Sequence, residues 1–163
     1  HHENKALILG DASHAIVPFH GQGMNSGFED CSELIRLLEK HNDDWSEVLP
    51  EFDRIRRPNA NAIADMALEN YVTMRESVAD PKFQLKKELG FELEQRFPSR
   101  FVPRYSMVMF HLLPYAVAME RGVIQQAILS ELVEGISEIA EVDFAKARQR
   151  VTEQLPEVDL TRP

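Results

Sequence analysis

Residues 9–30 read LGDASHAIVPFHGQGMNSGFED, and this stretch decides the fold of the first part of the chain. Just before it, the apolar run from Lys5 to Gly10 predicts a buried β-strand. Asp11 would then stand at the carboxyl end of that strand, where open α/β sheets bind their ligands. Gly21 and Gly23 would let the backbone approach a ligand closely and lead into a helix. The free N–H groups of that helix would face an electron-rich or anionic group.

Two other interpretations of this stretch stay open at this point. A plain strand, turn and helix would need Asp11 only as a capping residue, with no ligand bound. His14 and His20 lie six residues apart, but a metal site needs further ligands and the nearby sequence supplies no clear third one. A structural role for His14 beside the loop is therefore favoured, and no metal is predicted.

Composition limits the class of protein. The chain has 163 residues, a net charge of −9 and 44% hydrophobic residues, enough apolar material for one core. The high apolar fraction argues against a disordered chain, and the negative charge argues against a nucleic-acid partner. The single Cys31 excludes a disulfide framework and suits a reducing cytoplasm. No segment reaches the roughly 20 apolar residues that a membrane-spanning helix needs.

Apolar residues recur at helical spacing along most of the remaining chain, so this chain is predicted to be mostly α-helical. Pro114 suits the first position of one helix and Asp143 suits the N-cap of another. One strand, one glycine loop and five mostly helical segments are expected. The predicted helices run from about Met24 to Lys40, Ser46 to Ser77 with an interruption at Pro58, Lys82 to Arg96, Pro114 to Ile136 and Asp143 to Leu155, and the stretch from Phe97 to Phe110 is expected to be extended or irregular.

Several segments resemble a known family. Gly10-Asp-Ala-Ser-His, followed by Pro18-Phe-His-Gly-Gln-Gly-Met-Asn, is similar to the second flavin-binding motif of the class A flavoprotein monooxygenases. Residues 66–74 (MALENYVTM), 100–110 (RFVPRYSMVMF) and 114–125 (PYAVAMERGVIQ) narrow the resemblance to the kynurenine 3-monooxygenase family. The resemblance implies an α/β parent fold with a Rossmann-like FAD-binding domain. Residues 1–42 would be the C-terminal part of that domain, and residues 43–163 a helical domain over the substrate site.

The resemblance also implies roles for residues at matching positions. Asp11 would bind the ribityl chain of FAD, whereas Asn70 and Tyr105 would hydrogen-bond the amino-acid carboxylate of the substrate. The flavin carries the chemistry, so no side chain is assigned as catalytic. Ser13 departs from the family pattern, in which Ala is commoner there. The residues implied for the cofactor are Gly10, Asp11, Pro18, Gly21, Gln22, Gly23, Met24 and Asn25, and those implied for the substrate are Pro18, Phe19, His20, Gln22, Asn70, Met74 and Tyr105.

The implied reaction is the FAD-dependent hydroxylation of L-kynurenine at C3, with NADPH as transient electron donor and O2 as co-substrate. The family's ADP-binding glycine turn and its substrate-binding Arg are not found in this sequence. We therefore expect a C-terminal portion that needs the N-terminal half of the enzyme for activity. The mitochondrial members carry a C-terminal membrane anchor that this sequence lacks, so either a bacterial-type cytoplasmic form or a truncated chain is expected.

Alternatives remain for the function and for single residues. The chain could come from another class A aromatic hydroxylase, or be a non-catalytic helical interaction fragment. Taken by itself, Asn70 on an apolar helix face reads as a buried amide with satisfied hydrogen bonds. The methionines Met66, Met107, Met109 and Met119 read as adaptable core packing, whereas the family resemblance makes Met74 a pocket-lining residue.

Overall fold

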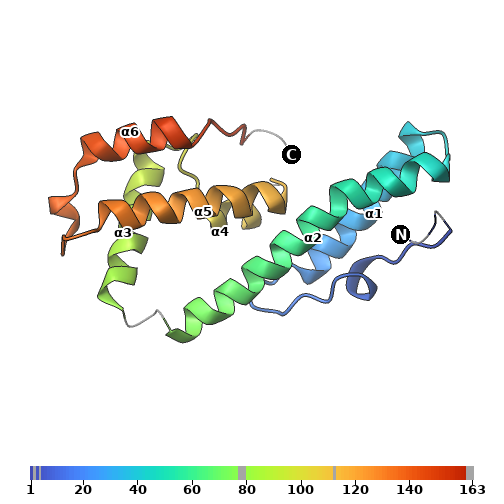
Figure 1. The fold of residues 1–163 in the computed structure, drawn as a ribbon, viewed down its shortest axis with the longest axis horizontal. Helices are drawn as coiled ribbons and strands as arrows, with labels where there is room; N and C mark the ends of the chain where they lie inside the picture. The colour runs from blue at the N-terminus through green and yellow to red at the C-terminus, as the bar shows by residue number, and fades with distance from the viewer. Residues whose placement is uncertain (2, 4, 77–79, 112, 161–163) are drawn as a thin grey trace. The chain divides into compact units, whose positions relative to one another are not determined.

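The computed structural model describes residues 1, 3, 5–76, 80–111 and 113–160. The predicted end of the second helix, Ser77, and the last residues, 161–163, lie outside the described residues. The chain divides into two compact units, His1–Val72 and Thr73–Pro163, and each is described by itself. The elements are η1 (Gly10–Ala12), α1 (Gly23–Lys40), α2 (Trp45–Glu76), α3 (Pro81–Arg96), α4 (Arg104–Met109), α5 (Tyr115–Leu132), η2 (Ile139–Glu141) and α6 (Phe144–Gln154) (Figure 1).

The predicted strand before Gly10 is not present, because the described residues form no β-strand. The segment is nevertheless extended at Leu9, with φ −131° and ψ 162°. Leu7 and Leu9 pack against the core of the first unit while Ile8 is exposed, which is the alternation of an extended chain. A strand needs a neighbour to accept and donate its backbone hydrogen bonds, and the described residues contain no second strand to pair with it. The prediction of a buried strand is therefore wrong, although the segment is extended and packs two of its side chains against the core.

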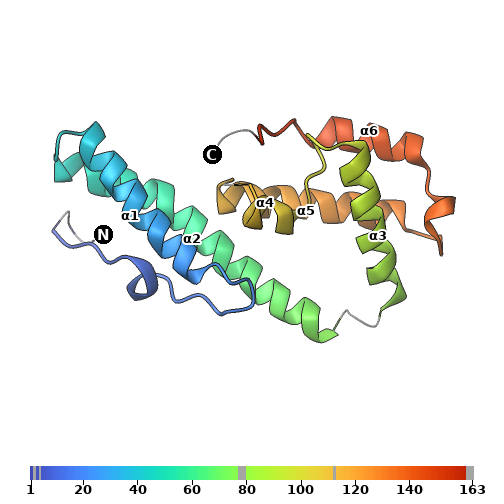
Figure 2. The ribbon, with the colours of Figure 1, turned by 180° about the vertical axis from the view of Figure 1, so that it is seen from behind.

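Helices α1 and α2 form an antiparallel pair in the first unit and lie side by side in Figures 1 and 2. The predicted helix from about Met24 to Lys40 is confirmed. The polar turn after it reverses the chain, and its residues Asn42 and Asp43 adopt positive φ angles of 50° and 61°. Short polar side chains tolerate this left-handed conformation better than other non-glycine residues. Buried Leu37, Val48 and Phe52 join the two helices.

The predicted interruption at Pro58 is wrong, since α2 is a continuous helix that contains both Pro50 and Pro58. Proline removes one backbone hydrogen bond and usually kinks or breaks a helix. Here the residues on both sides are held by packing, because Phe52 is 5% exposed and Ile63 is fully buried. Tertiary packing therefore outweighs the local cost of the proline.

Helices α3 to α6 build the second unit around one apolar core. In Figures 1 and 2, α5 lies beside α6, and α3 crosses them steeply. The predicted helices at about 82–96 and 143–155 are confirmed. Asp143 is the N-cap as expected, and its carboxylate accepts hydrogen bonds from the N–H groups of Ala145 and Lys146 at 3.0 Å. The core consists of Leu85, Leu89, Leu93, Phe101, Ile128, Leu129, Leu132, Val133, Val142, Ala147, Val151 and Leu155.

Two predictions in this unit need correction. The stretch from Phe97 to Phe110 contains a short helix, α4, which buries Met107 and Val108. Pro103 precedes it with φ −53°, an angle that is already compatible with the start of a helix. The next helix ends at Leu132, four residues before the predicted end, and Pro114 is its N-cap and not its first residue. None of the helices in the described part of the chain is both long and apolar enough to span a membrane.

Candidate flavin-binding turn and helix start

The turn η1 sits on the start of α1 in the first unit. Gly10 has φ +56°, a left-handed conformation that favours glycine, and its carbonyl oxygen accepts hydrogen bonds from Ser13 N at 2.8 Å and His14 N at 2.9 Å. A Cβ atom added to Gly27 of α1 would lie 3.5 Å from the Gly10 Cα, so the two backbones are close. The turn leaves Asp11 exposed to solvent, as a carboxylate that binds a polyol must be.

A buried ionic network fixes this turn to both helices of the unit. The Asp30 carboxylate of α1 accepts hydrogen bonds from Gly10 N at 3.0 Å and from Arg56 Nε of α2 at 2.7 Å. His14 Nε2 lies 2.5 Å from the same carboxylate. Arg56 also donates to a Glu29 carboxylate oxygen at 2.9 Å and to the Ser26 carbonyl oxygen at 3.1 Å. The Gly10 turn is therefore held by Asp30, whose side chain is 2% exposed and pairs with the buried Arg56.

Opposing effects set the protonation of this network. Burial acts to raise the pKa of the Asp30 carboxyl, but hydrogen bonds from Arg56, His14 and the Gly10 backbone outweigh it and place the pKa below its ordinary value. For Arg56, burial acts to lower the pKa of the guanidinium, while Asp30 and Glu29 raise it above its ordinary value. Both side chains are thus charged at neutral pH, and each compensates the other.

The glycine loop after the turn leads directly into α1. Gly21 has φ +68°, and its N–H donates to the Pro18 carbonyl oxygen at 3.3 Å. Gln22 is the N-cap of α1, but its side chain makes no cap hydrogen bond and instead accepts one from Asn25 Nδ2 at 2.9 Å. The first N–H groups of α1 are thus not capped by that side chain. A helix start of this kind attracts electron-rich or anionic groups.

These features fit the part of FAD that the sequence assigns to this region. Asp11 is an exposed carboxylate on a rigid turn, suited to accept hydrogen bonds from ribityl hydroxyls. A Cβ atom on Gly23 would meet no atom within 4 Å, so the helix start is open to a bound group. Met24 is 71% exposed and Asn25 is also exposed beside it. The residues predicted for the flavin therefore lie within one segment, and all of them except buried Gln22 are at least partly open to solvent.

The residues predicted for the substrate fall into two groups. In the first unit, Asn70 Nδ2 of α2 donates to the Phe19 carbonyl oxygen at 2.6 Å. The Phe19 ring packs on Tyr71, with ring centroids 4.6 Å apart. Asn70 thus joins the glycine loop to α2. An amide nitrogen carries two N–H donors, and this bond uses one of them.

Other predicted substrate residues differ in exposure. His20 and Gln22 are buried at 9% and 4% exposure, whereas Pro18 is exposed. Met74, one turn beyond Asn70 along α2, is 60% exposed. His14 is bonded to Asp30, and no group of three His, Cys, Asp or Glu side chains that could hold a metal occurs among the residues that the structure describes. These observations support a structural role for His14.

Tyr105 belongs to the second unit. It lies in α4, is 56% exposed, and meets the Phe110 ring edge-on at a centroid distance of 6.2 Å. Asn70 and Tyr105 are in different units, and their common contact with a substrate carboxylate stays a prediction.

Sequence reasoning gave no role to Asp30 or Arg56. Arg56 stands four residues after buried Phe52 and four before buried Ala60, on the same helical face. A cation on a buried face needs a carboxylate partner. That signal was available in the sequence, whereas the identity of the partner was not.

Comparisons with known proteins identify the relatives of this chain. Residues 1–67, which include the turn, the loop and the start of α1, match a family model described as an FAD binding domain. The chain is 46% identical over 155 residues to a protein of Myxococcus xanthus named kynurenine 3-monooxygenase, and 47% identical over 156 residues to one of Stenotrophomonas maltophilia with the same name. The resemblance to the kynurenine 3-monooxygenases is confirmed.

The alignments cover most of this chain but only part of each relative. They span 95% and 96% of the chain, and 33% and 34% of the two kynurenine 3-monooxygenase relatives. A third one, from Xanthomonas oryzae pv. oryzae, is 45% identical over 98% of the chain and 35% of its own length. The chain thus spans about a third of the length of the curated relatives it matches.

Proposed function

We propose that this chain is the C-terminal portion of an FAD-dependent monooxygenase that hydroxylates L-kynurenine at C3, with NADPH as electron donor and O2 as co-substrate. The observation that carries the proposal is the 46% identity to a kynurenine 3-monooxygenase over 95% of the chain. The match extends through both units and is not confined to the flavin-binding motif. This favours the kynurenine reaction over that of another aromatic hydroxylase, and it argues against a non-catalytic fragment.

In this proposal the first unit binds the ribityl and ring portions of the cofactor. Asp11 accepts hydrogen bonds from the ribityl hydroxyls, and the Asp30–Arg56 pair keeps the Gly10 turn in place for it. The start of α1 stabilises negative charge at the pyrimidine edge of the ring. Bound FAD supplies electron transfer from NADPH and the activation of O2, and the side chains supply binding and orientation. The backbone and side chains that would surround it are those of Gly10, Asp11, Pro18, Gly21, Gln22, Gly23, Met24 and Asn25.

The substrate residues orient the aromatic ring for reaction. Asn70 and Tyr105 donate hydrogen bonds to the amino-acid carboxylate of kynurenine, and Met74 lines the same pocket. Pro18, Phe19, His20 and Gln22 border the ring. Fixing one end of the substrate brings its reacting carbon to a defined position, and correct positioning can supply a large part of a rate enhancement.

The remaining part of the protein completes the cofactor site. We propose a Rossmann-like α/β parent domain to which residues 1–42 belong, and a helical domain formed by residues 43–163. The N-terminal half would supply the glycine turn for the ADP portion of FAD. A cytoplasmic location is proposed as well, because the only cysteine, Cys31, is unpaired and exposed, which suits a reducing compartment.

Reconstitution tests this function. The chain is co-expressed with the N-terminal segment of a bacterial kynurenine 3-monooxygenase, and NADPH oxidation and product are measured with and without L-kynurenine. We expect kynurenine-dependent NADPH oxidation with formation of the 3-hydroxylated product. The isolated chain serves as control and should retain little FAD.

Three outcomes would contradict parts of the proposal. Oxidation that depends on a different aromatic acid would assign the chain to another aromatic hydroxylase. Absence of flavin binding in every combination would favour an interaction fragment. Stoichiometric FAD on the isolated chain would show that no second half is needed for binding.

A further inference from the structure

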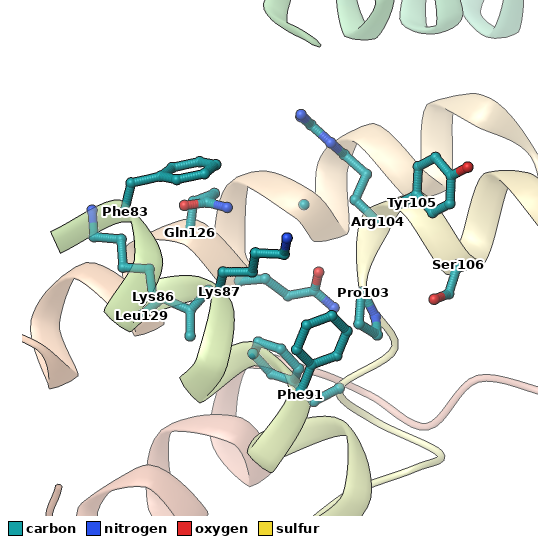
Figure 3. Close-up of a pocket in the computed structure, with 14 residues that line it drawn as sticks. Phe83, Lys86, Lys87, Phe91, Pro103, Arg104, Tyr105, Ser106, Gln126 and Leu129 are labelled. Atoms are coloured by element: carbon teal, nitrogen blue, oxygen red, sulfur yellow. The ribbon is translucent and has the colours of Figure 1, made fainter. Parts of the chain in front are cut away.

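A cavity of about 340 Å³ lies within the second unit, among α3, the start of α4 and α5 (Figure 3). Ligand sites in proteins typically measure about 300–1,000 Å³, so the volume suits a small molecule. Phe83 and Phe91 of α3 and Phe101 before α4 give it aromatic walls. Phe91 is 53% exposed although its side chain is large and apolar. The aromatic walls would stack on a planar ring.

Gly90 keeps this cavity open. It lies inside α3, where glycine costs about 0.5–1 kcal/mol of stability relative to alanine. A Cβ atom added there would meet no atom within 4 Å, so close packing does not require the glycine. The space that a side chain would take is part of the cavity. The glycine therefore has a role in the shape of the cavity and none in helix packing.

The charge of the lining is opposite to that of the chain. Lys86, Lys87 and Arg104 line the cavity and no Asp or Glu does, although the chain carries a net charge of −9. The Lys86 ammonium donates to Ser130 Oγ at 2.9 Å, and Ser130 is not among the lining residues, so this charge is directed away from the cavity. A Cβ atom on Gly122 would lie 2.5 Å from the Arg104 Cδ, so the arginine stem crosses α5 at that glycine. The two remaining cations, Lys87 and Arg104, lie beside aromatic walls and favour an anion with an aromatic body.

From these features we propose that this cavity, here named the α3–α5 pocket, binds a small aromatic carboxylate without an ammonium group. The carboxylate would pair with Lys87 and Arg104, and the ring would lie between Phe83 and Phe91. An amino acid is a weaker match, because its ammonium group is repelled by the same cations. The site is distinct from the proposed contact of Tyr105 with kynurenine. Figure 3 shows the Tyr105 hydroxyl pointing away from Lys87 and Phe91, so only the ring of Tyr105 borders the pocket.

Fluorescence titration with naphthalene-2-carboxylate tests the pocket in the whole 163-residue chain. Naphthalene-2-carboxamide, which has the same ring system and no charge, is the matched ligand control. We expect saturable binding of the carboxylate, at least tenfold tighter than that of the amide and weakened by salt. Equal affinities for the two, or no saturation by the carboxylate, would overturn the proposal. L-Kynurenine binding as tightly as the carboxylate at this pocket would overturn it too.

Variants locate the binding and separate it from folding. Gly90→Leu should fill the pocket and abolish binding, while helix content by circular dichroism stays the same. Lys87→Gln should weaken binding about tenfold without blocking the pocket. Lys82→Gln, on the same helix but outside the lining, is the control and should bind like the parent.

Tyr105→Phe distinguishes this pocket from the proposed function. It keeps the ring and should leave naphthalene-2-carboxylate binding unchanged, even if kynurenine hydroxylation fails. Parent-like binding by both Gly90→Leu and Lys87→Gln would place the probe elsewhere and refute the proposal.

Discussion

Different interactions stabilise the interiors of the two units. At the centre of the first unit a charged pair, Arg56 and Asp30, is almost entirely buried, with side-chain exposures of 9% and 2%. At the centre of the second unit the fully buried side chains are apolar, among them Leu89 and Leu93. Burying charges carries a large desolvation cost, so a buried pair is an inefficient way to gain stability alone. In the first unit the pair instead fixes the Gly10 turn. The Asp30 carboxylate accepts a hydrogen bond from Gly10 N, which an apolar side chain could not do.

The largest expected effect is the loss of that pair. Arg56→Met should destabilise the chain by about 3–5 kcal/mol, because Asp30 remains buried and charged without its cation. Urea denaturation followed by circular dichroism measures the change. Arg57→Met is the matched control: its side chain is 70% exposed, so the change should stay within about 0.5 kcal/mol. Equal midpoints for the two variants would show that the pair is not what holds the turn.

The second unit should respond strongly to lost packing volume. Leu89→Ala removes a fully buried side chain and should cost about 2–5 kcal/mol through lost transfer energy and a cavity. Val123→Ala, on a side chain that is 59% exposed, should change stability by less than about 0.5 kcal/mol. Both are measured by the same denaturation. A cost below about 1 kcal/mol for Leu89→Ala would contradict a close-packed core.

Low pH should lower the stability of the first unit through its carboxylates. Because the pKa of Asp30 is lower in the folded chain than in the unfolded one, the folded state binds fewer protons there. Its contribution is therefore complete above the unfolded pKa near 3.8 and is lost as the pH falls through the folded pKa. Glu51, whose pKa Lys40 and His41 hold at about 2, acts in the same direction.

Asp30→Asn measures this dependence. The stability gap between parent and variant should be about 1.5–3 kcal/mol at pH 7 and should shrink towards pH 3, once the pH is below the unfolded pKa near 3.8, because the unfolded chain then takes up a proton that the folded chain does not. Hydrogen exchange of α1 amides locates the change in the first unit. A gap that stays constant between these pH values would mean that the charge of Asp30 does not contribute.

The comparison of units also shows what sequence can predict. Helices α1 and α3 follow from apolar spacing, and α6 follows from apolar spacing and its Asp143 cap, since these signals are local. The missing strand before Gly10 could not be predicted, because strand pairing depends on residues distant in sequence or outside this chain. Pro58 differs from its prediction for a related reason: the local effect of proline predicts a break, but tertiary packing keeps α2 continuous.

The candidate site also has some features that the sequence predicts and others that it does not. The glycine loop and Asp11 are recognisable from residue type and order. The Asp30–Arg56 contact joins positions 26 residues apart, and spacing alone does not reveal it. The α3–α5 pocket was also missed, because its lining comes from three segments whose individual patterns read as ordinary helices and loops.

Asp11 tests whether the first unit's rigid turn serves the cofactor. In the reconstituted protein, Asp11→Ala should weaken FAD binding roughly 10- to 150-fold, since it removes charge-assisted hydrogen bonds to hydroxyl groups. Flavin fluorescence during dialysis measures retention. Asp44→Ala, which removes an exposed carboxylate near the far end of α1, is the control and should retain FAD like the parent. Unchanged FAD retention by Asp11→Ala would show that Asp11 only stabilises the turn and does not bind the cofactor.

The smallest expected effect concerns Tyr105, the second unit's proposed contribution to substrate binding. Tyr105→Phe removes one hydroxyl and keeps the ring, so kynurenine binding to the reconstituted protein should weaken about tenfold. Because the side chain is 56% exposed, melting temperature and flavin content should stay unchanged. Asn70→Leu should act on the same carboxylate, so the double variant should lose less than the sum of the single losses.

A kynurenine analogue without the carboxylate provides the control for that prediction. It lacks the group that Tyr105 is proposed to bind, so its affinity should be the same for the parent and for Tyr105→Phe. Asn70→Leu is a less specific test, since Asn70 also donates to the Phe19 carbonyl oxygen. Loss of that hydrogen bond should loosen the glycine loop. A packing role for Tyr105 predicts a different pattern, with a lowered melting temperature and equal losses for both ligands. Parent-level kynurenine binding by Tyr105→Phe would remove the second unit from carboxylate recognition and leave Asn70 as its only contact in this chain.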